Sequence, residues 1–341
     1  LKEKENEKKK RVEDRLNHFL DFDLLQKFSY VVIAKRMDDV FLLQLEFVGD
    51  DERKGLPEVR GVCRVDELRR NDPLLCSLFT CEIGKKERNL IENRNEAILP
   101  YDRTRVRLLE PQGYVNANYI NDLSNDRNPL YICSQIPPHQ CRDFWSMVFE
   151  HGTSVIVVLR DDKVERSVGY LPQEINVGDL FYDTTMEPVF SIEVKYKMNT
   201  ESDQLTVADL LMKNIATEKI VLVRYISFNA WPQEEIPAST DLLLKTFDLT
   251  NACLEAKKSK VIVQSLLGAG RAGTWILAHQ CLQKLLSYED RSKARISIYQ
   301  VLLRMREQRM ALVSNLKQYQ FAYRLIYDGL VQHNFDFKGA K

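Results

Sequence analysis

Residues 261–275 read V-I-V-Q-S-L-L-G-A-G-R-A-G-T-W, and the fold can be worked out from this stretch. Three β-branched apolar residues end in the polar pair Gln264 and Ser265, and a loop with two glycines and Arg271 leads into an amphipathic run. A strand, a turn and a helix start can together direct several backbone N–H groups at one point, where a guanidinium also binds an oxyanion. From this loop alone, an oxyanion cradle and a plain corner with glycines for packing fit equally well.

Length and composition are those of a globular protein. The 341 residues fit one large domain or two ordinary ones, and 44% hydrophobic residues allow a sizeable core. Basic and acidic residues number 49 each, so the net charge of zero argues against a general nucleic-acid binder. No apolar run approaches the ~20 residues that span a bilayer. The chain starts at Leu1 rather than Met, which we interpret as a fragment of a longer protein.

The cysteine and histidine patterns predict neither disulfides nor a metal site. The seven cysteines are odd in number and contain no C-x-x-C pair, so we expect free thiols in a reducing, cytoplasmic compartment. The five histidines are dispersed and form no ligand pattern. We therefore expect no metal and no cofactor.

The composition divides the chain into three parts. Residues 1–15 are nearly all charged and predict a solvated helix or a disordered lead-in. Residues 16–74 contain apolar residues at helical spacing and an alternating stretch over 41–48, so we expect an extension that packs on the main domain or elaborates it. Residues 75–335 form the main domain.

Within the main domain, predicted strands alternate with predicted helices, which indicates an α/β fold with helices on both faces of a sheet. The predicted strands cover residues 114–120, 131–135, 153–159, 194–198, 219–227 and 261–263. The predicted helices cover residues 78–91, 143–150, 242–256, 274–286, 296–309 and 319–329.

Several stretches, in this order, resemble the framework of the protein tyrosine phosphatase domain over residues 75–332. They are N-R-N-E-A-I-L-P-Y-D-R-T-R-V-R-L from Asn93, Y-V-N-A-N-Y-I from Tyr114, D-F-W-S-M-V-F-E from Asp143, Y-L-P from Tyr170, W-P-Q-E-E-I-P from Trp231, the 261–275 loop and Q-Y-Q-F from Gln318. The resemblance implies a single domain in which helices flank a highly twisted mixed β-sheet.

The chain departs from that family at the positions that carry its chemistry. The family loop is H-C-x-x-G-x-x-R followed by Ser or Thr; here Gln264, Ser265 and Ala272 replace the His, the Cys and the Ser or Thr. Gln233 replaces the general-acid Asp of the W-P-D loop. Ser314 replaces the first glutamine of the water-positioning pair.

These replacements predict a catalytically inactive domain. A serine hydroxyl is no substitute for a thiolate, Gln264 cannot accept a proton, and Gln233 has no proton to donate to the leaving tyrosine oxygen. Glu234 and Glu235 are acids that can in principle donate a proton, but they lie one and two positions further along the loop. Ser265 alone would also fit a substrate-trapping substitution, but the number of departures indicates a natural pseudophosphatase.

Phosphate binding survives as a hypothesis, with Arg271 and the loop residues Gly268, Gly270, Ser265 and Ala269 as the binding set. Bulky leucines in the loop argue against it, and so does the loss of the aromatic wall, since Asn95 stands where the family has Tyr. In the alternative, Arg271 only holds the loop by hydrogen bonds. The residues predicted for phosphotyrosine recognition or partner contact are Asn95, Ala97, Arg103, Gln318 and Glu234.

The favoured function is therefore that of a pseudophosphatase that binds and sequesters or inhibits a tyrosine-phosphorylated partner, such as a kinase. The pattern of loss is also similar to that of the egg-activation pseudophosphatases, which implies a DYRK-family kinase as partner and a place at the cell cortex. The alternatives are a structural or scaffold module with an empty pocket, and a weak phosphatase acting on another phosphoester.

Overall fold

The computed structural model describes residues 79–110, 113–123, 130–138, 142–162, 165, 178–182, 188–200, 202–233, 235–289, 294 and 296–335. The chain divides into two units, Leu1–Cys76 and Ser77–Lys341, and all of these residues belong to the second. The predictions for residues 1–15 and 16–74, and the role predicted for Glu234, lie outside the described residues.

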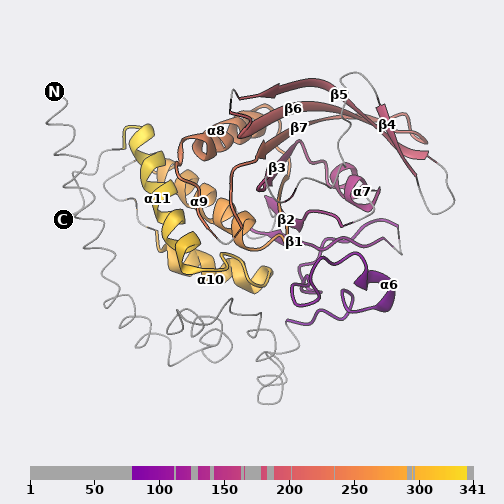
Figure 1. Ribbon diagram of the computed structural model, residues 1–341, viewed down its shortest axis with the longest axis horizontal. Coiled ribbons are helices and arrows are strands. Elements are labelled where there is room, and N and C mark those ends of the chain that lie inside the picture. The colour runs from indigo at the N-terminus through magenta and orange to yellow at the C-terminus, as the bar shows by residue number, and fades with distance from the viewer. Residues whose placement is uncertain are drawn as a thin grey trace, which may run out of the picture. The chain divides into compact units, whose positions relative to one another are not determined.

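The centre of the described unit is one mixed sheet of eight strands in the order β1-β2-β8-β3-β7-β6-β5-β4 (Figure 1). The pairs β2–β8, β8–β3 and β3–β7 are parallel. The remaining pairs are antiparallel. The strands are β1 Ala117–Ile120, β2 Tyr131–Gln135, β3 Val155–Leu159, β4 Gly178–Tyr182, β5 Pro188–Asn199, β6 Leu205–Asn214, β7 Ile220–Phe228 and β8 Val261–Ser265. Strands β2, β3 and β8 are buried throughout, as expected for parallel strands covered on both faces.

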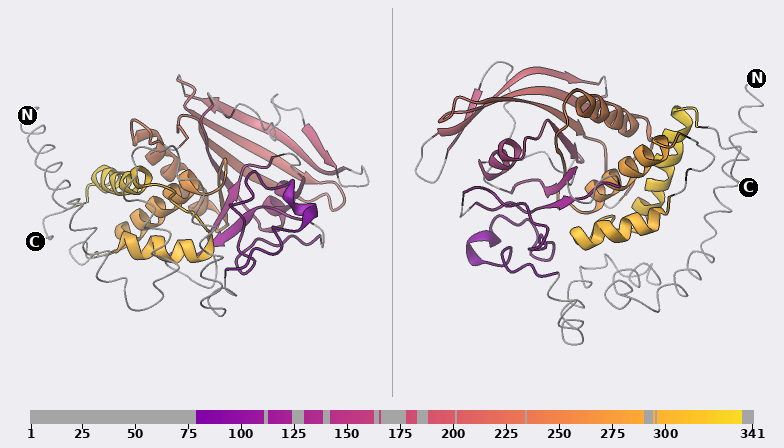
Figure 2. Two further views of the ribbon diagram at one scale, coloured as in Figure 1. Left: turned by 60° about the horizontal axis from the view of Figure 1, so that its bottom comes forward. Right: turned by 180° about the vertical axis from the view of Figure 1, so that it is seen from behind.

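Helices cover both faces of this sheet, as the sequence predicted (Figure 2). The helices are α6 Glu87–Leu90, α7 Arg142–Glu150, α8 Asp241–Ala256, α9 Gly270–Leu286, α10 Ile298–Gln308 and α11 Leu316–Gln332. Residues of α8 to α11 share one hydrophobic cluster with the sheet, and residues of α7 share the other.

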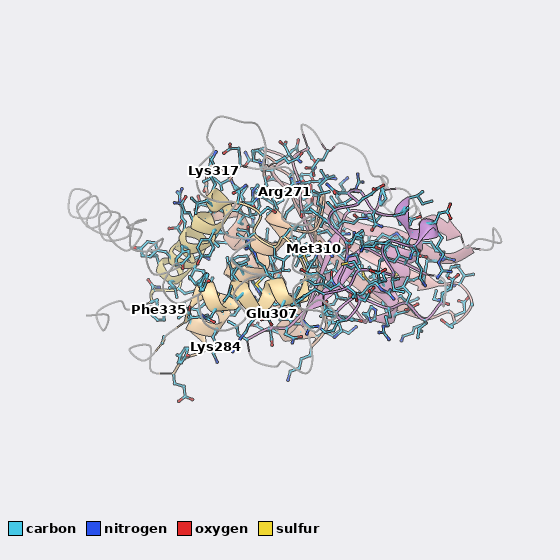
Figure 3. The ribbon with its side chains drawn as sticks, turned by 90° about the horizontal axis from the view of Figure 1, so that it is seen from below. Arg271, Lys284, Glu307, Met310, Lys317 and Phe335 are labelled. Carbon is cyan, nitrogen blue, oxygen red and sulfur yellow. The ribbon has the colours of Figure 1, made fainter. Side chains whose placement is uncertain are left out.

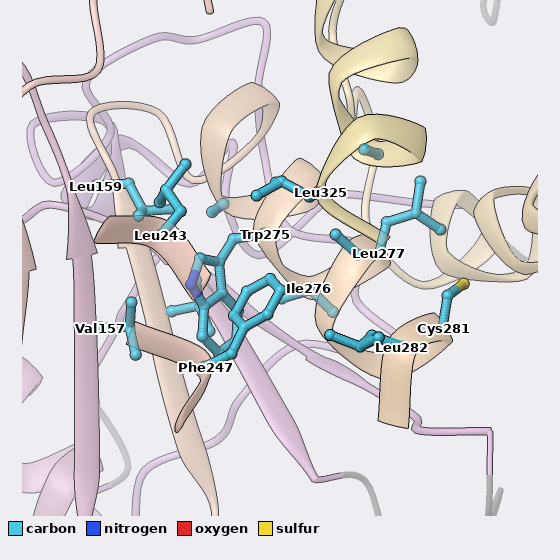
Figure 4. Packing of buried hydrophobic residues seen from close by; sticks show 14 of the residues in the cluster. Val157, Leu159, Leu243, Phe247, Trp275, Ile276, Leu277, Cys281, Leu282 and Leu325 are labelled. Atoms are coloured by element: carbon cyan, nitrogen blue, oxygen red, sulfur yellow. The ribbon is translucent and has the colours of Figure 1, made fainter. Parts of the chain in front are cut away.

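The larger cluster is built around α9, whose residues are almost all buried (Figure 4). The Trp275 ring stacks on His279 with centroids 4.7 Å apart, and Phe247 of α8 meets Trp275 edge-on at 5.0 Å. His279 contacts the Tyr131 hydroxyl at 2.7 Å and Asn251 at 3.0 Å. This packing fixes α9, and therefore the loop that precedes it.

Most predicted elements are present, but one predicted helix is largely absent and two strands were missed. Of the helix predicted over residues 78–91, only Glu87–Leu90 is helical, because the Asn89 and Asn93 amides bond carbonyls in the preceding turns, at Ile83 and Gly84. Strands β4 and β6 were not predicted, although β5 pairs with both of them. Helix α9 begins at Gly270, four residues before the predicted start at residue 274.

Candidate functional site

The cradle predicted from the sequence lies where β8 ends and α9 begins. Gly268 has φ 61°, and a Cβ at this position would lie 2.3 Å from the carbonyl carbon of Ser134. Its N–H donates to the Ser265 carbonyl at 3.0 Å, which closes the turn. The first hydrogen bond of α9 runs from the Gly273 N–H to the Ala269 carbonyl. The N–H groups that precede Gly273 in the first turn therefore have no acceptor within the helix. Only glycine permits this close approach of the loop to β2.

Arg309 binds the backbone of the cradle loop through its guanidinium. Its side chain is fully buried and donates to the carbonyls of Gly268 and Leu267 and to the side-chain oxygens of Asn116 (2.8 Å) and Asn118 (2.7 Å). Burial lowers the pKa of Arg309 from its usual value. No carboxylate is among these acceptors, so the guanidinium is held by neutral oxygens that fix the loop.

Arg271 lies on the first turn of α9 and is only 5% exposed. Its Nη1 donates to the Trp231 carbonyl at 3.0 Å, and its Nη2 donates to a carboxylate oxygen of Glu165 at 2.5 Å. The Glu165 side chain is 6% exposed, and its second oxygen, Oε2, has no hydrogen-bond partner among the described residues. An anion entering the cradle would therefore meet a guanidinium that already has a carboxylate partner.

Sequence reasoning missed Glu165. It lies 106 positions before Arg271, inside a charged stretch with no periodic pattern. An arginine that is buried must find a partner, because an isolated buried charge is costly. That rule demands a carboxylate or carbonyl near Arg271 but does not say which of the acidic residues provides it.

The residues at the nucleophile position offer no group that ionises easily. Ser265 is 2% exposed, and its carbonyl accepts from the N–H groups of Ile136 and Gly268. Gln264 is fully buried and its amide donates to the Gln135 carbonyl at 3.1 Å. The thiol below the loop, Cys133, bonds the Gly268 carbonyl at 3.3 Å, and burial raises its pKa to about 11. At neutral pH this thiol is protonated.

The loop before α11 touches the cradle from the side. A Cβ on Gly270 would lie 2.6 Å from the Gln318 side-chain oxygen and 2.9 Å from the Ser314 hydroxyl. The same Gln318 oxygen accepts from the Ser314 N–H at 3.0 Å. Val313 has φ 58°, an unusual conformation for a β-branched residue. Ser314 in this loop and Gln318 on α11, both predicted from the sequence, thus lie next to Gly270.

The predicted general-acid loop is tied to the cradle and to α11. Trp231 is fully buried, and its indole N–H donates to the Glu235 carbonyl at 3.0 Å. The Lys317 ammonium contacts both carboxylate oxygens of Glu235, at 2.7 and 2.9 Å. Gln233 is exposed on this loop. Figure 3 shows Arg271 at the start of α9 and Lys317 at the start of α11.

The loop predicted to recognise a substrate ring approaches the cradle through its backbone. The Arg94 N–H donates to the side-chain oxygen of Gln135, the residue that pairs with Ser265 across β2 and β8. The Asn95 oxygen accepts from the Ala97 N–H at 2.8 Å, so both predicted residues belong to one tight turn.

Arg103, also predicted as a partner contact, is engaged elsewhere. Its guanidinium donates to the Glu307 carbonyl on α10 at 2.9 Å and lies 5.6 Å from the centre of the Phe79 ring. These contacts lie away from the cradle residues, and the role of Arg103 toward a partner stays a prediction.

In the part of the chain that the structure describes, no group of three or more His, Cys, Asp or Glu side chains is placed to hold a metal ion. None of its helices combines the length and the hydropathy needed to cross a bilayer.

Comparison with known proteins gives consistent results at the family level. The model of the protein-tyrosine phosphatase family matches residues 89–328. The human receptor-type tyrosine-protein phosphatase-like N is 32% identical over 280 residues, which cover 75% of this chain and 27% of that protein. The rat receptor-type tyrosine-protein phosphatase N2 is 31% identical over 253 residues, with 70% and 23% covered. The chain thus spans about a quarter of these relatives.

Solved structures agree with the fold. One structure comes from work on the PTPN18 fingerprint on distinct HER2 tyrosine phosphorylation sites. It has a TM-score of 0.66 at 25% identity, and the match covers 79% of this chain and 94% of that one. A second, of PTPN18 in complex with HER2 phosphopeptides, has a TM-score of 0.65 at 25% identity and covers 80% and 100%. The predicted fold, one α/β domain with a mixed sheet flanked by helices, is confirmed.

Proposed function

The chain belongs to the protein-tyrosine phosphatase family, and we propose that its domain binds a phosphotyrosine-bearing protein without hydrolysing the phosphate. One observation carries the proposal. Arg271 is kept and oriented at a glycine-built cradle whose nucleophile position is Ser265. Such a site retains the means to hold an anion and lacks the means to cleave it.

The binding half of the proposal rests on the cradle. The first-turn N–H groups of α9 point along the helix axis, where the helix dipole favours negative charge. Arg271 uses Nη1 and Nη2 for Trp231 and Glu165, but a guanidinium has five N–H donors, so further donors exist for a phosphate. Ser265 also places no thiolate against the incoming dianion.

The inactive half rests on the neighbours of Ser265. The Gln264 side-chain amide donates to a backbone carbonyl, and an amide cannot act as a base toward the serine hydroxyl. Gln233 carries no ionisable proton, and loss of general-acid help costs about 10²–10⁴ in rate. Glu235, the neighbouring acid that is described, is bonded to Lys317.

The proposed partner is a tyrosine-phosphorylated kinase, sequestered or inhibited when its phosphotyrosine enters the cradle. One of the PTPN18 structures, which has a related fold, is a complex with HER2 phosphopeptides, and this supports phosphotyrosine as the ligand class. We extend the proposal to a DYRK-family kinase at the cell cortex on the pattern of lost catalytic residues alone. The same reasoning proposes a cytoplasmic, scaffold-like role in kinase signalling.

A second candidate is a structural module whose pocket holds no ligand. The Arg271–Glu165 pair favours it, because both partners are buried and Glu165 supplies the negative charge that a phosphate would bring. In this case Arg271 holds the loop, Trp231 and Glu165 together, and any partner binds elsewhere.

Titration of a fluorescent phosphotyrosine peptide, followed by anisotropy, separates the candidates. The proposal expects micromolar binding that is lost in Arg271→Ala and retained in Arg304→Ala, an exposed arginine on α10. Absence of binding to every such peptide, with a partner still co-purifying, supports the structural module. Turnover of a small aryl phosphate that disappears in Arg271→Ala would instead revive the weak-phosphatase alternative.

A further inference from the structure

The opposite end of β8 carries a second group of charges. Lys260 directly precedes this strand, and its ammonium lies 5.8 Å from the ring centre of Tyr119. The Tyr119 ring meets His151 edge-on at 5.5 Å, with its hydroxyl 3.3 Å from the ring nitrogens. Because β8 has five residues, this group lies roughly 16 Å along the strand from Ser265. It is therefore separate from the cradle.

Further cations border this group. The His151 ring is hydrogen-bonded to the Arg107 backbone, and the Arg107 charge acts on Tyr119. Lys257 and Lys258 are exposed just before Lys260. We call Arg107, His151, Lys257, Lys258 and Lys260 the basic surface.

The charge of the basic surface is only partly balanced. Among the described residues, Arg107, Lys257 and Lys258 form no ion pair. The acid that faces Tyr119 is Glu150, whose carboxylate accepts from the Leu109 N–H at 2.8 Å. Arg107, Lys257 and Lys258 therefore remain available to a negatively charged ligand.

Contacts hold the Lys260 and His151 side chains and the segment that carries the lysines. The Ser154 and Ser259 hydroxyls are hydrogen-bonded, which joins the lysine segment to the turn between α7 and β3. Burial lowers the pKa of Lys260, and burial followed by the Lys260 charge lowers the pKa of His151. A negative ligand would favour the charged form of both groups, so its binding would take up protons at His151.

We propose that the basic surface binds an acidic segment of a protein partner. Complementary charge of this kind raises association rates and selects partners. Lys260 and His151 are half-buried and held by Tyr119, which suits a ligand with carboxylates at set positions. An anionic lipid surface instead attracts clusters of flexible, exposed basic residues.

The test is anisotropy of a fluorescein-labelled peptide of alternating glutamate and serine, titrated with the full chain. Arg107→Glu/Lys260→Glu is expected to weaken binding at least about tenfold, and added salt to weaken the wild type. The matched control is Lys86→Glu/Lys245→Glu, which makes the same charge change at two exposed sites and should bind within about twofold of wild type.

A second variant tests the role of His151. It remains informative even if the Arg107→Glu/Lys260→Glu variant does not fold. Wild-type affinity should rise a few-fold from about pH 7.5 to about pH 5.5, and His151→Gln should flatten that rise. Equal losses in the reversal and its control, or equal binding of a peptide with glutamine in place of glutamate, would overturn the proposal. Tighter binding to phosphatidylserine vesicles than to the peptide would overturn it in favour of a membrane.

Discussion

At the scale of single residues, two glycines with almost the same backbone conformation separate conformational strain from steric fit. Gly268 has φ 61° and Gly152 has φ 60°. A Cβ on Gly268 would strike the backbone of Ser134, whereas a Cβ on Gly152 would meet nothing within 4 Å. The cradle therefore depends on glycine for space as well as for its torsion angle.

Gly268→Ala should lower the free energy of unfolding by about 3 kcal/mol or more, since left-handed strain of about 1–2 kcal/mol adds to a backbone clash. Gly152→Ala should lose only the strain, about 1 kcal/mol. Urea denaturation of both variants checks the difference. Equal losses would mean that the loop moves away from β2 without cost.

His279 is a second residue whose environment can be measured. Burial lowers its pKa to about 3, against about 6.5 in an unfolded chain. As the pH falls below about 6.5, the unfolded state gains a proton that the folded state does not, so stability is lost.

Between about pH 7 and pH 5, the free energy of unfolding of the wild type should fall by about 2 kcal/mol more than that of His279→Gln. The matched control is His333→Gln, because His333 is exposed and should leave the wild-type loss in place. Denaturant titrations at the two pH values give the comparison. A parallel fall in wild type and His279→Gln would show that His279 is protonated in the folded protein.

At the scale of elements, α10 ends in a residue that belongs functionally to the cradle. Arg309 is the C-cap of α10, and it binds the 266–269 loop together with two asparagines at the edge of β1. The loop is thus supported by an element that is not adjacent to it in the chain.

Arg309→Met should cost about 3–5 kcal/mol in the free energy of unfolding, because buried amide and carbonyl oxygens lose their donor. Arg304→Met, on the exposed side of the same helix, should change stability by about 0.5 kcal/mol or less. Thermal and urea denaturation measure both. A loss below about 1 kcal/mol in Arg309→Met would show that water or another donor replaces the guanidinium.

The elements differ in how far the sequence predicts them. Strand β8 and the presence of α9 were predictable because an unbroken β-branched run meets a glycine turn, although α9 begins four residues before its predicted start. The segment before α6 was not, because the Asn89 and Asn93 side chains donate to its carbonyls at Ile83 and Gly84. Glu165 was also unpredictable, since its partner Arg271 is distant in sequence. Local pattern predicts elements, and long-range pairing completes the site.

At the scale of the whole described unit, the site combines segments from far apart in the chain. Arg271 comes from α9, Glu165 follows β3, Trp231 follows β7 and Gln318 lies on α11. The loops after β3, β7 and β8 leave the same end of the parallel strands, where sheets of this kind place their ligands. The family fold is therefore present, and under the proposed function only its reactive groups are missing.

If that is so, chemistry should return in steps as reactive groups are restored. Ser265→Cys supplies a thiol beside the first turn of α9 and Arg271, which together lower a thiol pKa. This variant should slowly hydrolyse an aryl phosphate whose leaving group is stable as an anion. It should act much less on a phosphotyrosine peptide, because tyrosinate must be protonated as it leaves.

Adding Gln233→Asp supplies that proton, so Ser265→Cys/Gln233→Asp should hydrolyse the phosphotyrosine peptide about 10²-fold faster or more than Ser265→Cys alone, with a smaller gain on the activated ester. Phosphate release by stopped-flow measures both substrates. Ser265→Ala/Gln233→Asp is the control and should release none.

The Ser265→Cys/Gln233→Asp variant could instead stay inactive and still bind the peptide. In that case Gln264 and Ala272, or the Glu165 carboxylate beside Arg271, must prevent the thiolate from forming. The loss of function would then extend beyond the two exchanged groups. If the wild type itself releases phosphate, the domain is an enzyme and the proposed binding function fails.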